Sequence, residues 1–205
     1  MNGLVDAAWD RIAAWLAGHA PATADCLNPP AADAAIADAE HTLGRPFPAD
    51  LVRWWQRVDG ARVLIGRANL FPPFYLPCGP AYMLGEWRTW QDVYLDPALG
   101  GPNAAGALEA LAETPAGSPV MVFVPAFVPI AIDGAGGNLV VDLRPGPRYG
   151  CVLGFSADSG SSGPHWDSVA AMLDDVATAL ELNTPSAGYV PIVTADRTLD
   201  WTRQP

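Results

Sequence analysis

The chain has 205 residues, of which half are hydrophobic and eight are tryptophan. Such a chain can bury enough apolar surface to fold, so global disorder is not expected, and its length favours one domain over two small ones. A formal net charge of −11 repels phosphate backbones, which argues against a nucleic-acid partner, and no apolar run is long enough to span a membrane. Three cysteines without paired spacing indicate free thiols, and the acidic, tryptophan-containing start differs from a signal peptide, so a cytoplasmic location is expected.

Three amphipathic helices are predicted in the N-terminal part of the chain. Apolar residues recur with helical spacing over residues 4–16, 36–43 and 51–58. Asn28 is expected to cap the second helix ahead of two prolines, and Gly44 stands where that helix should end in the left-handed conformation.

The third helix carries two adjacent tryptophans, Trp54 and Trp55. Neighbours on a helix point about 100° apart, so the two side chains cannot face inward in the same direction. One of them is therefore expected to reach a groove, an interface or a second packing layer. A tryptophan-lined groove would suit binding of a protein or a small ligand.

The middle of the chain is predicted to be less regular. Residues 62–78 indicate short extended pieces broken by prolines, and residues 84–95 indicate a helix with several aromatic residues on one face. Residues 97–118, rich in Pro, Gly and Ala, are expected to form a surface insertion around one short helix.

From residue 120 the hydrophobic period changes to that of strands. The runs VMVFV, FVPIAI, NLVVDL and CVLGF are separated by turn residues and predict neighbouring antiparallel strands. SADSGSSGPH is expected to be a flexible loop, Ser168 to cap a last helix, and residues 184–205 to form a strand or extended arm. The predicted fold is α+β: a single domain, 1–205, in which a central, mostly antiparallel sheet packs with N-terminal helices and a C-terminal helix.

The loop Asp133–Asn138 contains three glycines and invites comparison with nucleotide-binding loops. Those loops need their glycines to open a helix, whereas here the glycines lead into the strand NLVVDL. An Asp-Gly-containing hairpin is therefore predicted. Asp133, Asn138 and Asp142 offer too few oxygen ligands for calcium, so no metal site is expected.

No arrangement of residues indicates catalysis. The serine motif of the α/β-hydrolases is absent. His165 precedes Trp166 and Asp167, and a hydrolase using His165 with a nearby acid is the weakest of three hypotheses because adjacent residues rarely face each other usefully. The chain is expected not to be an enzyme and to use neither cofactor nor metal.

Three segments together resemble the SUKH superfamily. These are LNPPAADAAIADAEHTLGRPFPADLVRWWQRVDG, FVPIAIDGAGGNLVVDLRPGPRYGCVLGF and HWDSVAAMLDDVATAL, and the resemblance spans about residues 10–182. It leaves the 97–118 insertion and the C-terminal arm uncovered, and Phe127 stands where the family often has Trp. The resemblance implies an α+β fold with no catalytic residues. Bacterial members are similar to immunity proteins that bind a cognate toxin, frequently a nuclease, and fungal members of the Smi/Knr type to scaffolds of cell-wall signalling.

The first hypothesis is therefore a non-enzymatic immunity protein, monomeric or weakly dimeric, whose acidic surface binds a basic toxin domain. Its expected contact residues, as partner-facing loop positions, are Asp59, Asp133, Asn138, Asp142, Arg148, Tyr149 and Trp166, although Asp133 and Asp142 can equally serve to tie the hairpin together. The second is a scaffold or regulatory protein that binds through the tryptophan-lined groove.

Overall fold

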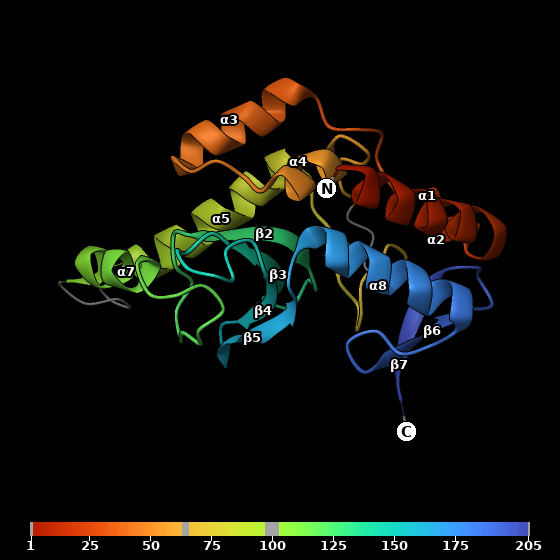
Figure 1. Cartoon of the computed structure of the whole chain (residues 1–205). Coiled ribbons are helices and arrows are strands. Elements are labelled where there is room, and N and C mark those ends of the chain that lie inside the picture. Colours follow the sequence, from red (N-terminus) through yellow and green to blue (C-terminus); the bar gives the residue numbers. More distant parts are fainter. Residues whose placement is uncertain (1, 63–65, 97–102, 205) are drawn as a thin grey trace.

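A computed structural model describes residues 2–62, 66–96 and 103–204 of the chain (Figure 1). The helices in these ranges are α1 (Asn2–His19), α2 (Pro21–Ala24), α3 (Asp33–Leu43), α4 (Ala49–Trp55), α5 (Pro80–Leu95), α7 (Ala104–Ala112) and α8 (Val169–Leu182). The strands are β1 (Leu76–Pro77), β2 (Phe127–Ile132), β3 (Gly137–Asp142), β4 (Val152–Ser156), β5 (Gly160–Trp166), β6 (Tyr189–Val193) and β7 (Leu199–Arg203).

Strands β1 to β5 form one antiparallel sheet in chain order, and β6 and β7 form a separate antiparallel hairpin. Every residue of β2 and β3 is buried, because these strands lie inside the sheet and are covered on both faces. The predicted α+β fold with a central antiparallel sheet is confirmed.

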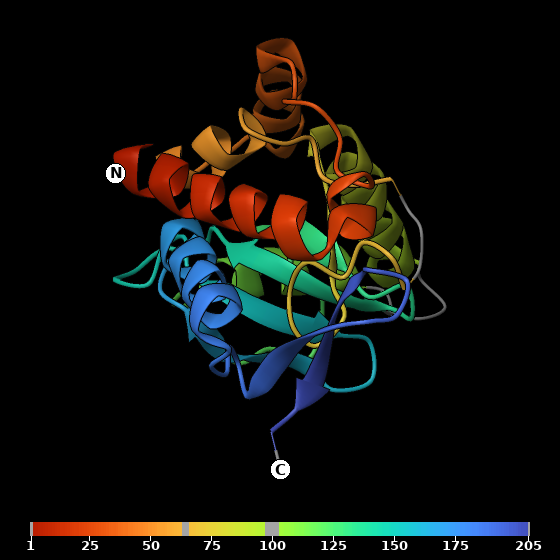
Figure 2. The same ribbon diagram turned by 90° about the vertical axis from the view of Figure 1, so that its right-hand side faces the viewer.

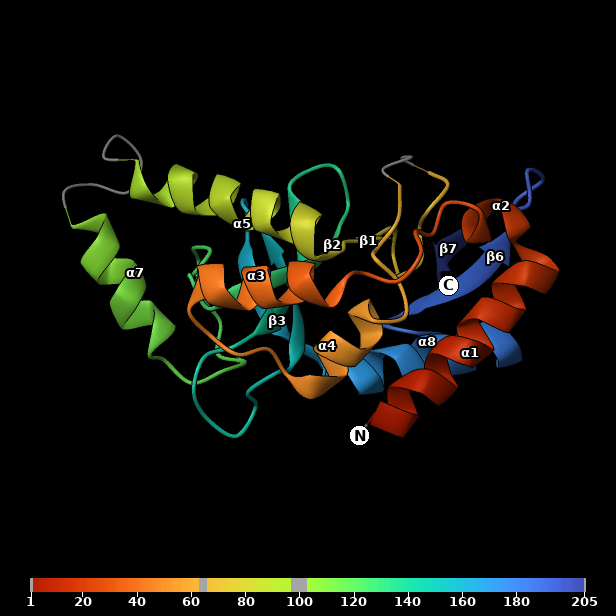
Figure 3. The same ribbon diagram turned by 90° about the horizontal axis from the view of Figure 1, so that it is seen from above.

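The helices divide into two groups around the sheet. Helix α5 packs on β2 and is itself covered by α3, while α1 lies along α8 and α4 contacts both (Figure 2). Seen from above, α5 and α7 lie at one end of the molecule, and α1, α8 and the β6–β7 hairpin lie at the other (Figure 3). Among the described helices, none is both long and apolar enough to cross a membrane.

The sequence signals at helix ends are confirmed at two positions and wrong at one. Gly44 ends α3 with a φ of 65°, a conformation that glycine adopts without strain, and the Ser168 hydroxyl accepts a hydrogen bond from Ala171 N at the start of α8. Asn28 does not cap α3, which begins only at Asp33. Its amide instead donates to Asp59 O at 2.8 Å and so joins the chain before α3 to the loop after α4.

Both tryptophans of α4 are fully buried, so the predicted groove is absent at this position. Trp54 packs against Trp9 and Phe71, whereas Trp55 packs edge-on against Phe47. The two rings can both be inside because α4 is enclosed on more than one side and packs in two layers, which a single helical wheel does not show.

One strand prediction and one loop prediction in the second half of the chain are wrong. Residues 120–124 form no strand, although Phe123 and Val124 are fully buried, because an apolar run indicates burial and not a specific backbone conformation. The expected loop SADSGSSGPH instead contributes most of β5, since pairing with β4 overrides the turn-forming composition of this segment.

The two segments expected to lie outside the core are attached to it. Residues 97–102 of the predicted insertion lie outside the described residues, α7 packs on α5, and residues 114–118 bind the sheet through Arg144. The tail forms the β6–β7 hairpin, which is fixed by a hydrogen bond from Leu199 N to the Thr23 hydroxyl and by another from the Trp201 indole to Asn69 O.

Candidate functional site

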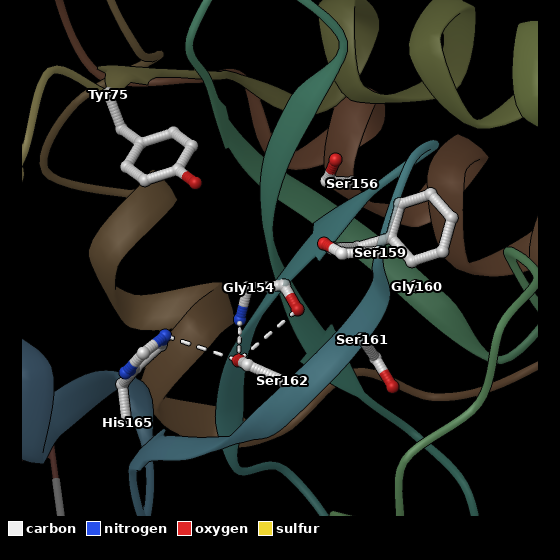
Figure 4. A pocket seen from close by; sticks show the side chains of 9 residues that line it. Tyr75, Gly154, Ser156, Ser159, Gly160, Ser161, Ser162 and His165 are labelled. Atoms are coloured by element: carbon white, nitrogen blue, oxygen red, sulfur yellow. Dashed lines mark hydrogen bonds between the residues drawn. The ribbon is translucent and has the colours of Figure 1, made fainter.

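A pocket of about 360 Å³ opens on the β4–β5 hairpin (Figure 4). The residues with polar side chains that line it are Tyr75, Ser156, Ser159, Ser161, Ser162 and His165. Tyr75 reaches the pocket from the segment before β1, and the other side chains come from β4, β5 and the turn between them. The lining is thus rich in neutral hydrogen-bonding groups.

Ser162 and His165 lie within hydrogen-bonding distance of each other in this pocket. The Ser162 hydroxyl lies 3.2 Å from His165 Nε2 and also accepts a hydrogen bond of 3.0 Å from Gly154 N (Figure 4). The pairing register shifts between Leu153 and Phe155, so Gly154 lacks a regular partner on β5. The serine hydroxyl therefore replaces a backbone acceptor at a β-bulge.

The pair supplies two parts of a catalytic triad but not the third. Partial burial lowers the pKa of His165 from its usual 6.5, which keeps the imidazole neutral at pH 7 and able to accept a proton. However, no carboxylate among the described residues hydrogen-bonds to His165, and the Ser162 oxygen already accepts from Gly154 N. Within the same residues, no group of three His, Cys, Asp or Glu side chains could hold a metal. The hydrolase hypothesis thus gains a nucleophile but lacks the group that would orient its base.

The acids expected at the hairpin act inside the fold. Asp142 lies in β3, not in a loop, and is fully buried in an ion pair with Arg144 at 2.7 Å. Asp133 Oδ1 accepts hydrogen bonds from Ala135 N and Gly137 N and so closes the β2–β3 loop, as expected for a tight hairpin. A Cβ atom at position 137 would lie 2.2 Å from Asp133 Oδ2, so a larger residue there would displace the carboxylate that closes the loop.

Asn138 is also buried, at the start of β3 and against α5. Its Oδ1 accepts a hydrogen bond of 2.6 Å from the Trp90 indole, and its Nδ2 donates to Glu86 Oε1 at 3.1 Å. The expectation that Asn138 is a partner-facing loop residue is therefore wrong as to its position, because it is a buried strand residue. Asn138 connects the β2–β3 hairpin to α5 and orients two side chains of that helix.

The remaining candidates are distributed over several surfaces. Trp166 is buried with its indole donating to Asp175, whereas Arg148 is exposed and Tyr149 is 44 % exposed with its hydroxyl donating to Pro46 O. Asp59 is partly buried beside Gly79, and burial raises the pKa of its carboxyl. That these residues contact a partner stays a prediction. Among them, Arg148 and Tyr149 have side chains that a partner could reach.

The candidates do not gather on one face. Asp133 and Asn138 lie at one end of β3, while Arg148 and Tyr149 lie in the loop that follows its other end. Neither Glu86, which lies one helical turn before Trp90, nor Ser162 was expected from the sequence to belong to a site. The spacing of Glu86 and Trp90 on one helix face was the available signal for the first.

Comparison with known proteins now assigns the family. The model of the SMI1 / KNR4 family (SUKH-1) matches residues 30–175, well over half of the chain. The chain belongs to the SUKH-1 family. This match confirms the family resemblance of the three sequence segments. It runs from before α3 into the first half of α8 and includes the sheet β1–β5, so residues 10–29 and 176–182 of the expected range lie outside it.

One relative of this SUKH-1 chain is a glucan synthesis regulatory protein of Neurospora crassa. The two are 27 % identical over 183 residues, which cover 75 % of this chain and 34 % of that protein. The chain therefore spans about a third of the length of the relative. Membership of the SUKH-1 family supports a non-catalytic role, regulatory or of the immunity type, that is exercised through interaction with another protein.

Proposed function

We propose that this chain is an immunity protein that neutralises a cognate nuclease-type toxin by binding it directly. The observation that carries the proposal is membership of the SUKH-1 family in a chain of net charge −11. A nuclease must attract a phosphate backbone and is therefore basic, and an acidic partner is captured faster by complementary charge.

The structure is compatible with binding through a preformed surface. The sheet and the helices share one hydrophobic core, and the β2–β3 hairpin is closed by Asp133 and anchored to α5 by Asn138. A rigid surface loses little conformational entropy when it binds, which favours tight association.

The test is co-expression with the toxin-like product encoded beside the gene for this chain. We expect the two proteins to co-purify and the chain to restore growth of cells that express the toxin. Their association rate should fall steeply as ionic strength rises. Absence of such a gene, together with empty pull-downs, would contradict the proposal.

A second candidate is a regulatory or scaffold protein. The observation that favours it is the relative named as a glucan synthesis regulatory protein. Since Trp54 and Trp55 are buried, this candidate no longer has the tryptophan-lined groove that the sequence had indicated. Binding of a host protein with no dependence on salt concentration would favour it over the immunity function.

A further inference from the structure

A second pocket, of about 220 Å³, lies between α5 and the β2–β3 loop. It is lined by Tyr82 and Glu86 of α5, by Ile132 and Asn138 at the strand ends, and by the loop glycines Gly134, Gly136 and Gly137. Its volume is below the usual range for drug-sized ligands and suits a single side chain. Space beside Gly136 is open, since a Cβ atom there would meet nothing within 4 Å.

One carboxylate in this pocket is held in place by buried groups. Glu86 Oε1 accepts hydrogen bonds from the Trp90 indole at 3.2 Å and from Asn138 Nδ2 at 3.1 Å. Trp90 is 8 % exposed and Asn138 is fully buried, so neither donor is free to turn away. The carboxylate is therefore fixed before any ligand arrives.

The charge of Glu86 is not neutralised within the described part of the chain. None of the ion pairs there includes Glu86, and Oε2 accepts no hydrogen bond from any described residue. Tyr82, one turn before Glu86, is 42 % exposed and presents an aromatic ring at the same pocket. Burial, followed by the nearby Cys78 and Glu86, raises the pKa of the Tyr82 hydroxyl.

We infer that this pocket binds the guanidinium group of an arginine side chain on the partner protein, an inference that rests on the proposed protein-binding function. A fixed carboxylate accepts charge-assisted hydrogen bonds, and an aromatic ring attracts a planar cation. Guanidinium suits both better than ammonium does, because it is planar and less strongly hydrated. A single carboxylate gives too few ligands for a divalent cation.

The experiment uses Nα-acetyl-arginine amide as the probe and the full chain as the protein. Binding is followed by the NMR shifts of the Gly134, Gly136 and Gly137 amides and of the Trp90 indole N–H. We expect saturable shifts with the arginine probe, weaker ones with the lysine analogue, and none with the neutral norleucine analogue. Absence of shifts up to the solubility limit of the arginine probe, or an equal response to the norleucine analogue, would overturn the inference.

Glu86→Gln is the decisive variant, because the amide oxygen can still accept from Trp90 and Asn138 while the charge is lost. We expect probe affinity to fall at least about tenfold, because that change corresponds to the free energy of a hydrogen bond to a charged group. Tyr82→Leu, at an exposed position, should lower it about threefold through loss of the ring. The matched control is Glu109→Gln on α7, an exposed carboxylate remote in sequence from this pocket, which should leave affinity unchanged.

Equal loss in Glu109→Gln and Glu86→Gln would mean general charge attraction and would overturn the inference. The probe assay contains no partner, so it separates the two claims. A chain that captures the toxin but does not bind the probe disproves the arginine pocket alone. A chain that binds the probe at Glu86 but never captures a toxin disproves the immunity function alone.

Discussion

Asp142 and Arg144 form an ion pair in which neither side chain has any exposed surface, with Arg144 Nη2 2.7 Å from Asp142 Oδ2. Asp142 also accepts a hydrogen bond from Gly117 N, and Arg144 donates to the Thr114 hydroxyl and to Ser118 O. Buried charges are tolerated when every polar group has a partner. The pair thereby attaches residues 114–118 to the end of β3.

Replacement of one member of this pair should strongly destabilise the fold. Asp142→Asn leaves the Arg144 guanidinium buried without a counter-charge, and the free energy of unfolding should fall by about 3–5 kcal/mol. The measurement is urea unfolding followed by tryptophan fluorescence. The matched control is Asp174→Asn, which breaks the ion pair with Arg11 at a side chain 68 % exposed and should cost about 0–1 kcal/mol. Equal losses in the two variants would contradict a special role for the buried pair.

The sequence predicted most of the fold where a local pattern and the tertiary structure agree. Apolar residues at helical spacing predicted α1, α3, α4, α5 and α8. The change of the hydrophobic period from 3.6 to 2 residues predicted β2, β3 and β4. The Asp-Gly signal correctly predicted the β2–β3 hairpin, whose loop Asp133 closes. In each case the signal lies within a few residues of the element that it specifies.

The candidate site could not be predicted in the same way, because burial depends on residues far away in the chain. The sequence around Asn138 is typical of a loop, but α5 covers this residue and Trp90 donates a hydrogen bond to it. The polar segment of β5 became a strand only because β4 lies beside it. The Glu86 pocket joins α5 to the β2–β3 hairpin through Glu86 and Asn138, which lie 52 residues apart in the chain, and no local pattern encodes that contact.

The two adjacent tryptophans of α4 should respond differently to the same substitution. Trp55 Nε1 donates to Cys78 O at 2.8 Å, whereas Trp54 Nε1 is buried without a hydrogen-bond partner among the described residues. Phenylalanine removes similar ring area at both positions, but only at position 55 does it leave a carbonyl unsatisfied. Trp55→Phe should therefore lower the free energy of unfolding by about 1–3 kcal/mol more than Trp54→Phe. Thermal and urea unfolding of the two variants decide this, and a larger loss at position 54 would refute it.

The thiols should be unreactive in the folded protein. Cys26, Cys78 and Cys151 are unpaired and buried. Burial, reinforced at Cys78 by Glu86, raises the pKa of that thiol, and burial with nearby Asp142 raises the pKa of Cys151 to about 11. At pH 8 the thiolate fraction is then negligible at these two positions. An aromatic disulfide reagent should therefore label neither Cys78 nor Cys151 in the folded protein. After unfolding it should label all three cysteines. Rapid labelling of Cys78 or Cys151 in the native state would disprove this.

His165 should make stability depend on pH in a defined direction. Partial burial lowers its pKa below 6.5 in the folded state, so the unfolded chain binds the proton more readily. The free energy of unfolding should therefore decrease as pH falls through and below 6.5, until the folded imidazole is protonated as well. The effect is small because the ring is partly exposed and screened by solvent.

The imidazole of His165 can be followed directly by NMR while the pH is lowered. We expect a titration midpoint below 6.5, and we expect His165→Gln to show a smaller loss of stability than the parent chain over the same pH range. Ser162→Ala provides the control, because desolvation and not the serine hydroxyl lowers the pKa. The midpoint should therefore stay below 6.5 in that variant. A midpoint at or above this value in the parent chain would show that the imidazole is more open to solvent than the geometry of the Ser162–His165 pocket implies.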